Sequence, residues 1–453
     1  MNNNVYFAGL DIGSSSIKLV VLMPISNGSL VVAGMSNLPS KGVKNGVVTN
    51  IDELSSSIHE VLEDIFVKTG IQISSVIVGI PPTMAGSRLI NGNTNINPDE
   101  NNERRINEKH IQKVTQSVLA NAMTLNRDIN NLQEVIDIVP EEFLIDQFGN
   151  IESPIGMVGA TLEMRANVYV APQILVEAYR SAISKAGLNI EKFVLSNYAF
   201  YKYVLDEQDA LNGAITIDFG AEQTTLTVIK DNSINYVTSV SKGGRNITLD
   251  ILNVLNETFS NLGMDFKTAE DLKRSKGIAD PLTIQNDQII NVVSTITGNL
   301  QEVSGRYVSE IIVARLKEII NELYERLVND FGNDIPNYNI VISGGAAALT
   351  GINEFLADVL DRRSILYIPS DIGARDPAWS NVIAISHTLA GQNSTDKAIN
   401  GTLINGTVNL NRSFNTRNDQ LQVKNLDSTS SNVKKSFDSI KNKIKDALGK
   451  IKE

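Results

Sequence analysis

The chain contains no cysteine among its 453 residues, which excludes disulfide bonds and thiolate chemistry. It has only three histidines, His59, His110 and His387, and they lie far apart, so a histidine-based metal site is not expected. It also has no run of about 18 apolar residues, so no segment is expected to span a membrane. The first residues, Met-Asn-Asn-Asn, lack the basic and apolar regions of a signal peptide, and we expect a cytoplasmic chain.

Length and charge narrow the possibilities further. A chain of this size is too long for one hydrophobic core, so about two to four domains are expected. The net charge of −11 disfavours nucleic acid as the main partner. This charge is uneven, because residues 433–453 hold seven lysines against three acidic residues, a net +4, which leaves −15 on residues 1–432. A basic tail on an acidic body suggests that the two parts meet different partners.

One turn occurs twice in the sequence. The first copy is Asp11-Ile12-Gly13 and the second is Asp218-Phe219-Gly220, 207 residues later. Each follows an apolar strand, continues into small polar residues, and leads into a second alternating strand. A single Asp-x-Gly is usually an ordinary hairpin turn, but two copies with matching flanks favour a pair of related phosphate-binding hairpins.

The residue types in these turns suit a nucleotide clamped between two related domains. Glycine allows a tight turn in which successive N–H groups face a phosphate. Asp11 and Asp218 could hold a hydrated Mg²⁺. The hydroxyl groups that could donate to phosphate oxygens belong to Ser14, Ser15, Ser16, Thr224 and Thr225. Asp-Phe-Gly also occurs in protein kinases, but no His-Arg-Asp loop and no Gly-x-Gly-x-x-Gly loop accompany it here.

Periodicity predicts an α/β order around an insertion. Strands are predicted at 5–10, 17–23, 30–35, 75–80 and 167–171, with helices at 51–69 and 172–186. Between them, a helix near 108–124 and strands around 133–148 and 157–170 suggest a separate subdomain at 82–167. Residues 245–333 are predicted to be mostly helical, with one apolar helix face formed by Ile311, Ile312, Leu316, Ile319, Ile320, Leu323 and Leu327.

A strand at 340–342 then runs into Ser343-Gly344-Gly345-Ala346, where a sugar or phosphate could approach the backbone closely. Residues 391–432 are rich in Asn, Thr, Ser and Gln and are predicted to form a disordered linker. Residues 433–453 are predicted to form an amphipathic helix that binds a membrane surface. Its apolar face comprises Val433, Phe437, Ile440, Ile444, Leu448 and Ile451.

Taken together, these segments resemble the actin-like ATPases and, within that superfamily, the FtsA family of bacterial cell-division proteins. The resemblance covers about residues 5–390 and also the tail. It implies duplicated actin-like (ribonuclease-H-like) α/β domains around a nucleotide cleft, an FtsA-type inserted subdomain and a C-terminal amphipathic helix. The implied division is 1–81 with 168–195 and 196–244 with 334–390 for the two cores, 82–167 for the insert, 245–333 for a helical subdomain, 391–432 for the linker and 433–453 for the membrane helix.

The resemblance also implies ATP and Mg²⁺ as cofactors and assigns further residues to the nucleotide. Asp11, Gly13, Ser14, Ser15, Ser16 and Lys18 match the first phosphate motif, and Asp218, Gly220, Thr224 and Thr225 match the second. The adenosine motif is matched by Gly344, Gly345 and Ala346, and the helix that contacts adenosine by Glu270 and Lys273. The loop before that helix is matched by Lys242, Gly243 and Gly244.

Relatives often hydrolyse ATP with a Gln or Glu in the segment that connects the two halves. Residues 195–199 offer neither, so we expect weak or no ATPase activity, with Glu222 or Gln223 as possible substitutes. No catalytic residue is assigned.

The implied function is that of a filament-forming adaptor that attaches FtsZ filaments to the cytoplasmic face of the membrane at the division septum. Its implied partners are the FtsZ C-terminal tail, other copies of the chain, anionic lipid and later division proteins, with no nucleic acid. By position, Arg306, Glu310 and Arg315 are candidates for the FtsZ contact, the alternative being a solvated helix face. Two other functions stay open: a PilM-like pilus-assembly protein and a small-molecule kinase of the same superfamily.

Overall fold

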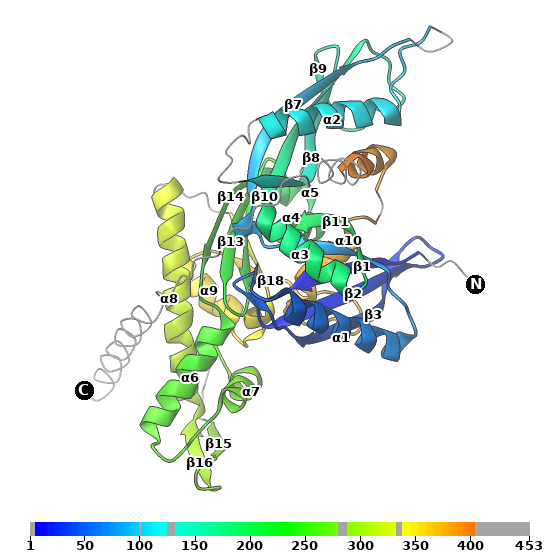
Figure 1. Ribbon diagram of the computed structural model, residues 1–453. Helices are drawn as coiled ribbons and strands as arrows, with labels where there is room; N and C mark the ends of the chain where they lie inside the picture. The colour runs from blue at the N-terminus through cyan, green and yellow to red at the C-terminus, as the bar shows by residue number, and fades with distance from the viewer. Residues whose placement is uncertain are drawn as a thin grey trace. The chain divides into compact units, whose positions relative to one another are not determined.

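The computed structural model describes residues 5–98, 102–124, 132–279, 288–331, 338–390 and 392–403 (Figure 1). Within these, the chain forms two compact units. The first comprises residues up to 205, with 370–374 and the segment from 381 onward, and the second comprises 206–369 and 375–380. The predicted membrane helix and most of the predicted linker lie outside the described residues.

The first unit is built on a five-stranded sheet in the order β11-β6-β1-β2-β3. Strand β1 pairs antiparallel with β2 on one side and parallel with β6 on the other. The apolar faces of helices α1 and α3 pack on this sheet in one hydrophobic core. The bounds are β1 Phe7–Ile12, β2 Ser16–Pro24, β3 Leu30–Pro39, β6 Ser75–Ile80, β11 Asn189–Leu195, α1 Ile51–Thr69, α3 Gln173–Lys185, α4 Ser196–Val204 and α10 Ser380–His387.

The bounds of helix α1 match the prediction because residues next to it mark its start and its end. The Asn50 side chain accepts hydrogen bonds from the N–H groups of Asp52 and Glu53, which caps the first turn. Gly70 ends the helix in a left-handed conformation, φ 71°. The predicted helices at 51–69 and 108–124 are confirmed.

The inserted subdomain has its own sheet, in the order β7-β10-β8-β9, with α2 packed on it (Figure 1). A Cβ atom on Gly92 would lie 2.6 Å from the backbone nitrogen of Val118, so glycine lets α2 approach β7 directly. Strand β10 leads into α3 and so returns the chain to the first core. The bounds are β7 Gly86–Asn95, α2 Glu108–Thr124, β8 Gln133–Ile145, β9 Phe148–Ile151 and β10 Thr161–Pro172.

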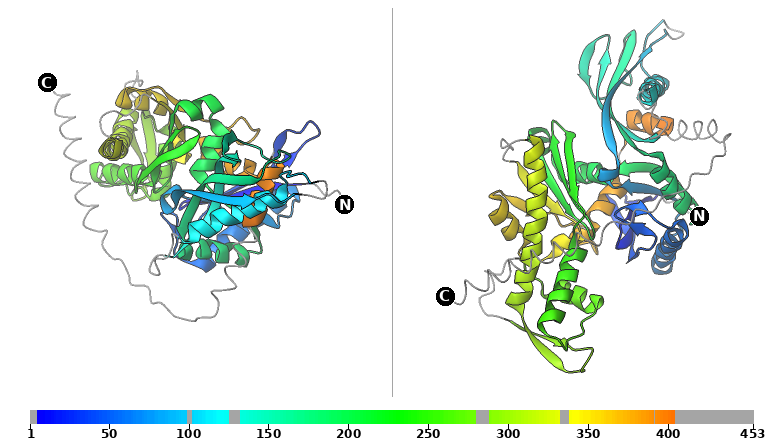
Figure 2. Two further views of the ribbon diagram at one scale, coloured as in Figure 1. Left: turned by 90° about the horizontal axis from the view of Figure 1, so that it is seen from above. Right: turned by 60° about the vertical axis from the view of Figure 1, so that its left-hand side comes forward.

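A helix occupies part of the predicted disordered linker. Residues 394–403 are helical and lie beside α2, in orange in Figure 2. Ala398, Ile399 and Leu403 are buried in the core of the inserted subdomain. The Lys192 ammonium on β11 lies 3.0 Å from Asn400 Oδ1 and 2.9 Å from a carboxylate oxygen of Asp137 on β8. The prediction of disorder is therefore wrong for this stretch, because three apolar side chains at helical spacing find a core to enter.

The second unit repeats the topology of the first, with a sheet in the order β14-β13-β12-β17-β18. Strand β12 pairs antiparallel with β13 and parallel with β17, as β1 does with β2 and β6. The duplicated fold inferred from the two turns is thereby confirmed. The bounds are α5 Glu207–Asn212, β12 Ala214–Phe219, β13 Thr224–Lys230, β14 Ser233–Val240, α6 Gly244–Thr258, α7 Phe266–Lys276, α8 Gly305–Phe331, β17 Asn339–Ser343, α9 Ile352–Leu360 and β18 Ser364–Leu366.

The helical subdomain of this unit differs from its prediction in one place. Helix α8 buries all seven apolar residues predicted for its inner face. However, β15 Ile289–Val293 and β16 Leu300–Ser304 form an antiparallel hairpin. Ile290 and Val292 are buried while their neighbours are exposed, an alternation typical of a half-buried strand. Among the described residues, no helix is long and apolar enough to cross a membrane.

We predict that Ile399→Ala loosens the inserted subdomain, because removing a buried Ile side chain leaves a cavity that costs about 2–4 kcal/mol. Hydrogen exchange should quicken in α2 and in residues 394–403, with a lower first melting transition. Lys397→Ala, an exposed position on the same helix, is the control. Equal exchange rates in the two variants would contradict the docking of this helix.

Candidate functional site

The two Asp-x-Gly turns have the same backbone geometry. In the first, the N–H of Gly13 donates to the carbonyl of Ser16 at 3.1 Å, and in the second, the N–H of Gly220 donates to the carbonyl of Gln223 at 3.0 Å. A Cβ atom would lie 2.9 Å from the Ser16 oxygen in the first and 2.7 Å from the Gln223 oxygen in the second. Both turns therefore require glycine at the third position.

Each turn places its aspartate at the end of a central strand. Asp11 lies opposite Lys18 in the β1–β2 register, and the Lys18 ammonium is 3.3 Å from Asp11 Oδ2. Asp218 lies opposite Thr225 in the β12–β13 register. The two aspartates thus hold equivalent positions in the two units, although only Asp11 faces a lysine across the register.

In the second unit, the loop before α6 docks on the hairpin through backbone atoms. The N–H of Gly244 donates to the carbonyl of Gly220 at 3.0 Å, and the N–H of Arg245 to that of Ala221 at 2.8 Å. A Cβ atom on Gly243 would lie only 2.4 Å from the Gly220 oxygen. The two predicted segments therefore form one rigid turn, with no space for a side chain between them.

The residues predicted for adenosine gather beside this loop. The ammonium of the buried Lys273 lies 2.9 Å from the carbonyl of Gly244, 2.8 Å from Thr248 Oγ1 and 2.7 Å from Glu270 Oε2. A Cβ atom on Gly244 would lie 3.0 Å from the Cβ atom of Ala346. Burial lowers the pKa of Lys273, while Glu270 raises it in part. Thr248 was not predicted, although it lies one helical turn after Gly244.

The Gly344-Gly345 turn completes this arrangement. Gly344 has φ 95°, and a Cβ atom there would lie 2.4 Å from Asp218 Oδ1. Its N–H donates to the carbonyl of Pro377 at 3.3 Å. Gly345 is exposed, and a Cβ atom on it would meet only Ala378, at 3.6 Å. Gly344 is therefore required by the fold, whereas Gly345 leaves its backbone open to a ligand.

The structure separates the predicted hydroxyl donors. Ser15 is exposed and Ser14 and Ser16 are half-buried at the first turn. Thr225 lies beside Asp218 in the register. The buried Thr224 donates its hydroxyl to the carbonyl of Lys242 at 2.8 Å, so its only hydroxyl hydrogen is already engaged. The prediction that Thr224 donates to phosphate is wrong for this arrangement, because the threonine instead holds the Lys242 loop.

Lys242 also differs from its predicted role. Its ammonium lies 2.9 Å from Glu318 Oε1 and 2.6 Å from Glu322 Oε2, both on α8. Burial disfavours the charge, but the hydrogen bonds to these carboxylates outweigh it and raise the pKa of Lys242. The side chain of Lys242 is therefore held by α8, and only its backbone belongs to the loop at the hairpin.

The two suggested substitutes for a catalytic residue both have structural partners. The Gln223 amide donates to Ser239 Oγ on β14 at 3.0 Å. A carboxylate oxygen of Glu222 lies 3.9 Å from the Arg245 guanidinium. These contacts give no reason to assign a catalytic role to Glu222 or Gln223.

The three residues predicted to contact FtsZ lie in different environments on α8. Arg315 is buried, and its guanidinium makes two hydrogen bonds to Asp250 on α6, at 2.5 and 2.8 Å, and one to Glu318 at 2.6 Å. Arg315 is therefore unsuited to contact a partner directly, and its prediction is corrected. Arg306 is exposed and Glu310 is half-buried, both in the first turns of α8.

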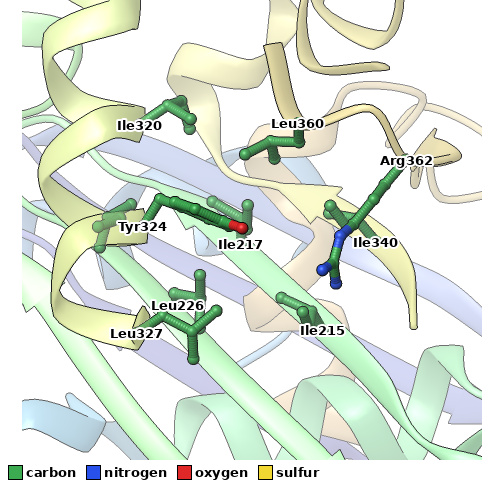
Figure 3. A pocket seen from close by; sticks show the side chains of 10 residues that line it. Ile215, Ile217, Leu226, Ile320, Tyr324, Leu327, Ile340, Leu360 and Arg362 are labelled. Carbon is green, nitrogen blue, oxygen red and sulfur yellow. The ribbon is translucent and has the colours of Figure 1, made fainter. Parts of the chain in front are cut away.

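A small hollow of about 20 Å³, partly open to solvent, lies elsewhere in the second unit, between its sheet and α8 (Figure 3). No predicted site residue lines it. Its walls are apolar apart from Tyr324 and Arg362 and belong mostly to the core of the unit; they are Ile215, Ile217, Leu226, Ile320, Leu323, Tyr324, Leu327, Ile340, Leu360 and Arg362. The hollow is thus a feature of core packing and not part of the site built on the hairpins.

Comparison with known proteins identifies the family. The family model described as "Cell division protein FtsA" matches residues 215–384, and "SHS2 domain inserted in FTSA" matches residues 86–170. The cell division protein FtsA of Streptococcus pneumoniae serotype 2 is 35% identical over 388 residues, which cover 85% of this chain and 80% of that protein. The chain belongs to the FtsA family.

Other FtsA proteins agree with this assignment. The FtsA of Enterococcus hirae is 31% identical, and the aligned residues cover 84% of this chain and 82% of that protein. The FtsA of Bacillus subtilis is 27% identical, and the aligned residues cover 85% of this chain and 83% of that protein. The inserted sheet of the first unit corresponds to the SHS2 domain of the family, since the matched residues 86–170 run from β7 into β10.

Solved structures show the same fold in actin-like proteins outside the FtsA family. The PilM–PilN type IV pilus biogenesis complex gives a TM-score of 0.55 at 18% identity, over 84% of this chain and 98% of that chain. MreB5 of Spiroplasma citri bound to AMPPNP gives a TM-score of 0.51 at 15% identity, over 88% of this chain and 98% of that chain. At these identities the likeness concerns the fold alone.

Proposed function

We propose that this FtsA-family chain binds ATP with Mg²⁺ through its two hairpins. The observation that supports this most directly is the convergence of four separate segments in the second unit. The Asp218 hairpin, the loop at 242–244, the adenosine-side residues on α7 and the turn at 344–346 meet where backbone atoms leave no space for side chains. Such glycine-bearing turns before helices are typical of sites where a nucleotide approaches the backbone.

The residues present fit such a ligand. Gly345 leaves an exposed backbone, and the half-buried Glu270 provides a carboxylate near it; Lys273 holds that carboxylate in place, since its three ammonium hydrogens are engaged by Gly244, Thr248 and Glu270. Asp11 and Asp218, which hold equivalent positions at the ends of their central strands, would hold Mg²⁺ through its water shell. When bound, Mg²⁺ would neutralise phosphate charge. Phosphate would be held by Gly13, Ser14, Ser15, Ser16, Lys18, Gly220 and Thr225.

Hydrolysis is proposed to be weak or absent. Gln223 is hydrogen-bonded to Ser239 and Glu222 lies near Arg245, so each of the two nearest candidates already has a structural contact. A general base has to lie within hydrogen-bond reach of the water that it activates. The partners of these side chains favour a nucleotide that acts mainly as a structural ligand.

At the level of the cell, we propose that the chain polymerises and tethers FtsZ to the cytoplasmic face of the membrane at the septum. Its relatives are named cell division proteins, which supports a role in division. The sequence of residues 433–453 supports membrane attachment, because six apolar residues at helical spacing accompany seven lysines. Many tails in one filament would bind lipid more firmly than a single tail.

The two alternative functions receive less support. The PilM–PilN structure shares the fold, but its 18% identity is well below that of the FtsA relatives. A small-molecule kinase would need a carboxylate aimed at a substrate, and it has no use for a basic amphipathic tail. The relatives and the tail therefore both favour the division role.

Nucleotide binding is tested with Asp218→Ala and Gly345→Val. The first removes the group proposed to hold the Mg²⁺ water shell, and the second places a side chain on the exposed backbone where Gly345 leaves space. Each should weaken ATP binding by about tenfold or more, since several hydrogen bonds or a steric fit are lost. Calorimetry with and without Mg²⁺ measures the effect. Ala348→Val, at an exposed position in the same turn, is the control. Wild-type ATP affinity in both Asp218→Ala and Gly345→Val would refute the nucleotide site.

The FtsZ contact is tested with Arg306→Glu. Reversing this exposed charge should weaken binding of an acidic FtsZ C-terminal peptide by about fivefold to tenfold, because a charge-assisted contact becomes repulsive. Fluorescence anisotropy with a labelled peptide measures the affinity. Lys317→Glu makes the same charge change at an exposed position further along α8. If the two variants weaken binding equally, the effect reflects overall charge and the pocket lies elsewhere.

Membrane attachment is tested with the double variant Phe437→Glu and Ile444→Glu, at the middle of the predicted apolar face. Co-sedimentation with anionic vesicles should fall by about tenfold or more, since each apolar side chain contributes about 1.5–3 kcal/mol when buried. ATP affinity should stay unchanged. Ser439→Glu with Asn442→Glu adds the same charge on the predicted polar face. Equal loss in both double variants would attribute binding to charge alone.

A further inference from the structure

The first Asp-x-Gly hairpin is contacted by a second, shorter hairpin of the same unit. A short hairpin, β4 Val43–Lys44 and β5 Val47–Val48, turns at Asn45 and Gly46, with φ 49° and 75°. The N–H of Gly46 donates to Ser14 Oγ at 3.3 Å. The Asn-Gly dipeptide is a typical signal for such a turn, but its position against the phosphate hairpin depends on tertiary structure.

Gly46 is in turn held by a tyrosine that is distant in sequence. The hydroxyl of Tyr179, on α3 and fully buried, donates to the carbonyl of Gly46 at 2.8 Å. A Cβ atom on Gly46 would lie 3.0 Å from both Pro81 Cγ and Met84 Cε, so the turn is also packed from its other side. The position of the Gly46 N–H is therefore fixed by Tyr179 together with this packing.

This contact has a chemical consequence for Ser14. A serine hydroxyl has one hydrogen to donate and two lone pairs that accept. Because Ser14 Oγ accepts the Gly46 N–H, its own hydrogen must point to a different acceptor. A phosphate oxygen at the first hairpin would be such an acceptor. Burial, and after it the charge of Asp11, raise the pKa of Tyr179, so its hydroxyl stays protonated as a donor at neutral pH.

We propose that Tyr179 is a positioning residue for nucleotide phosphate, acting through Gly46 on the hydroxyl of Ser14. This inference rests on the proposed function, since it concerns the same phosphate site. Tyr179 itself does not contact the nucleotide in this arrangement. Its effect on phosphate is transmitted through one residue, Gly46, whose carbonyl and N–H belong to the two peptide groups that meet at its Cα atom.

The test is a double-mutant cycle of ATP affinity with Tyr179→Phe, Ser14→Ala and both together. Tyr179→Phe keeps the ring and removes only the hydroxyl, and it should weaken ATP binding by about threefold to tenfold, the range of one hydrogen bond. Because Tyr179 acts through Ser14, the double variant should bind ATP no more weakly than Ser14→Ala alone. Tyr201→Phe, which removes another buried hydroxyl of the first unit, should leave the affinity unchanged.

The outcomes separate this inference from the proposed function. If the wild-type chain does not bind ATP, the proposed function itself fails. If it binds, and Tyr179→Phe has wild-type affinity or its effect adds to that of Ser14→Ala, the positioning role is refuted. Hydrogen exchange without nucleotide gives a second test: Tyr179→Phe should quicken exchange at residues 43–48 by about threefold or more, because the bond to the Gly46 carbonyl is lost, whereas Tyr201→Phe should not. Equal exchange in the two variants would also overturn the inference.

Discussion

The backbone hydrogen bond that closes each Asp-x-Gly turn is the constraint on which the site in each unit depends. It joins Gly13 to Ser16 in one unit and Gly220 to Gln223 in the other. The bond sets the register of the two strands, so that the aspartate lies at the end of a central strand. A side chain at the glycine would collide with the same carbonyl that accepts the bond. The turn, the register and the position of the carboxylate are therefore one structural requirement.

The two units stabilise this turn by different means. In the second, most of the contacts join backbone to backbone: the loop at 243–245 donates to the carbonyls of Gly220 and Ala221, at a distance that no Cβ atom permits, and the Thr224 hydroxyl adds one bond to the carbonyl of Lys242. In the first, side chains take part, since Ser14 Oγ accepts from Gly46 and Tyr179 holds Gly46. An added methyl group at Gly13 or Gly220 should therefore disturb folding in either unit, whereas loss of the Ser14 or Tyr179 hydroxyl in the first should leave the chain packed and alter ligand binding.

The parts that could be predicted from the sequence are those fixed by local rules. The capped helix α1 and the apolar face of α8 each have a signal within about twenty residues, and the two turns are recognised because one short pattern occurs twice. The errors arose where a distant partner decides. Arg315 reads as an exposed charge, yet its spacing from Ile312 and Ile319 places it on the buried face, where Asp250 meets it. The helix at 394–403 is not predicted, because the segment is mostly polar. Its three apolar residues are buried in the core of the inserted subdomain, which is formed by residues over 200 positions earlier in the sequence.

The buried charges explain why the loop at the second hairpin and helix α8 must be placed together. Arg315 on α8 is bound to Asp250 on α6, and Lys242, just before α6, is bound to Glu318 and Glu322 on α8. Separating α8 from α6 would leave the buried carboxylate of Asp250 without the Arg315 guanidinium, which costs several kcal/mol. Since α6 begins at Gly244, whose carbonyl also accepts from Lys273, the same ion pairs fix the loop against the hairpin. Helix α8, helix α6 and the loop at 242–244 therefore form one rigid group. The residues at the start of α8, Arg306 among them, belong to a helix whose position is fixed by its ion pairs with that loop and with α6.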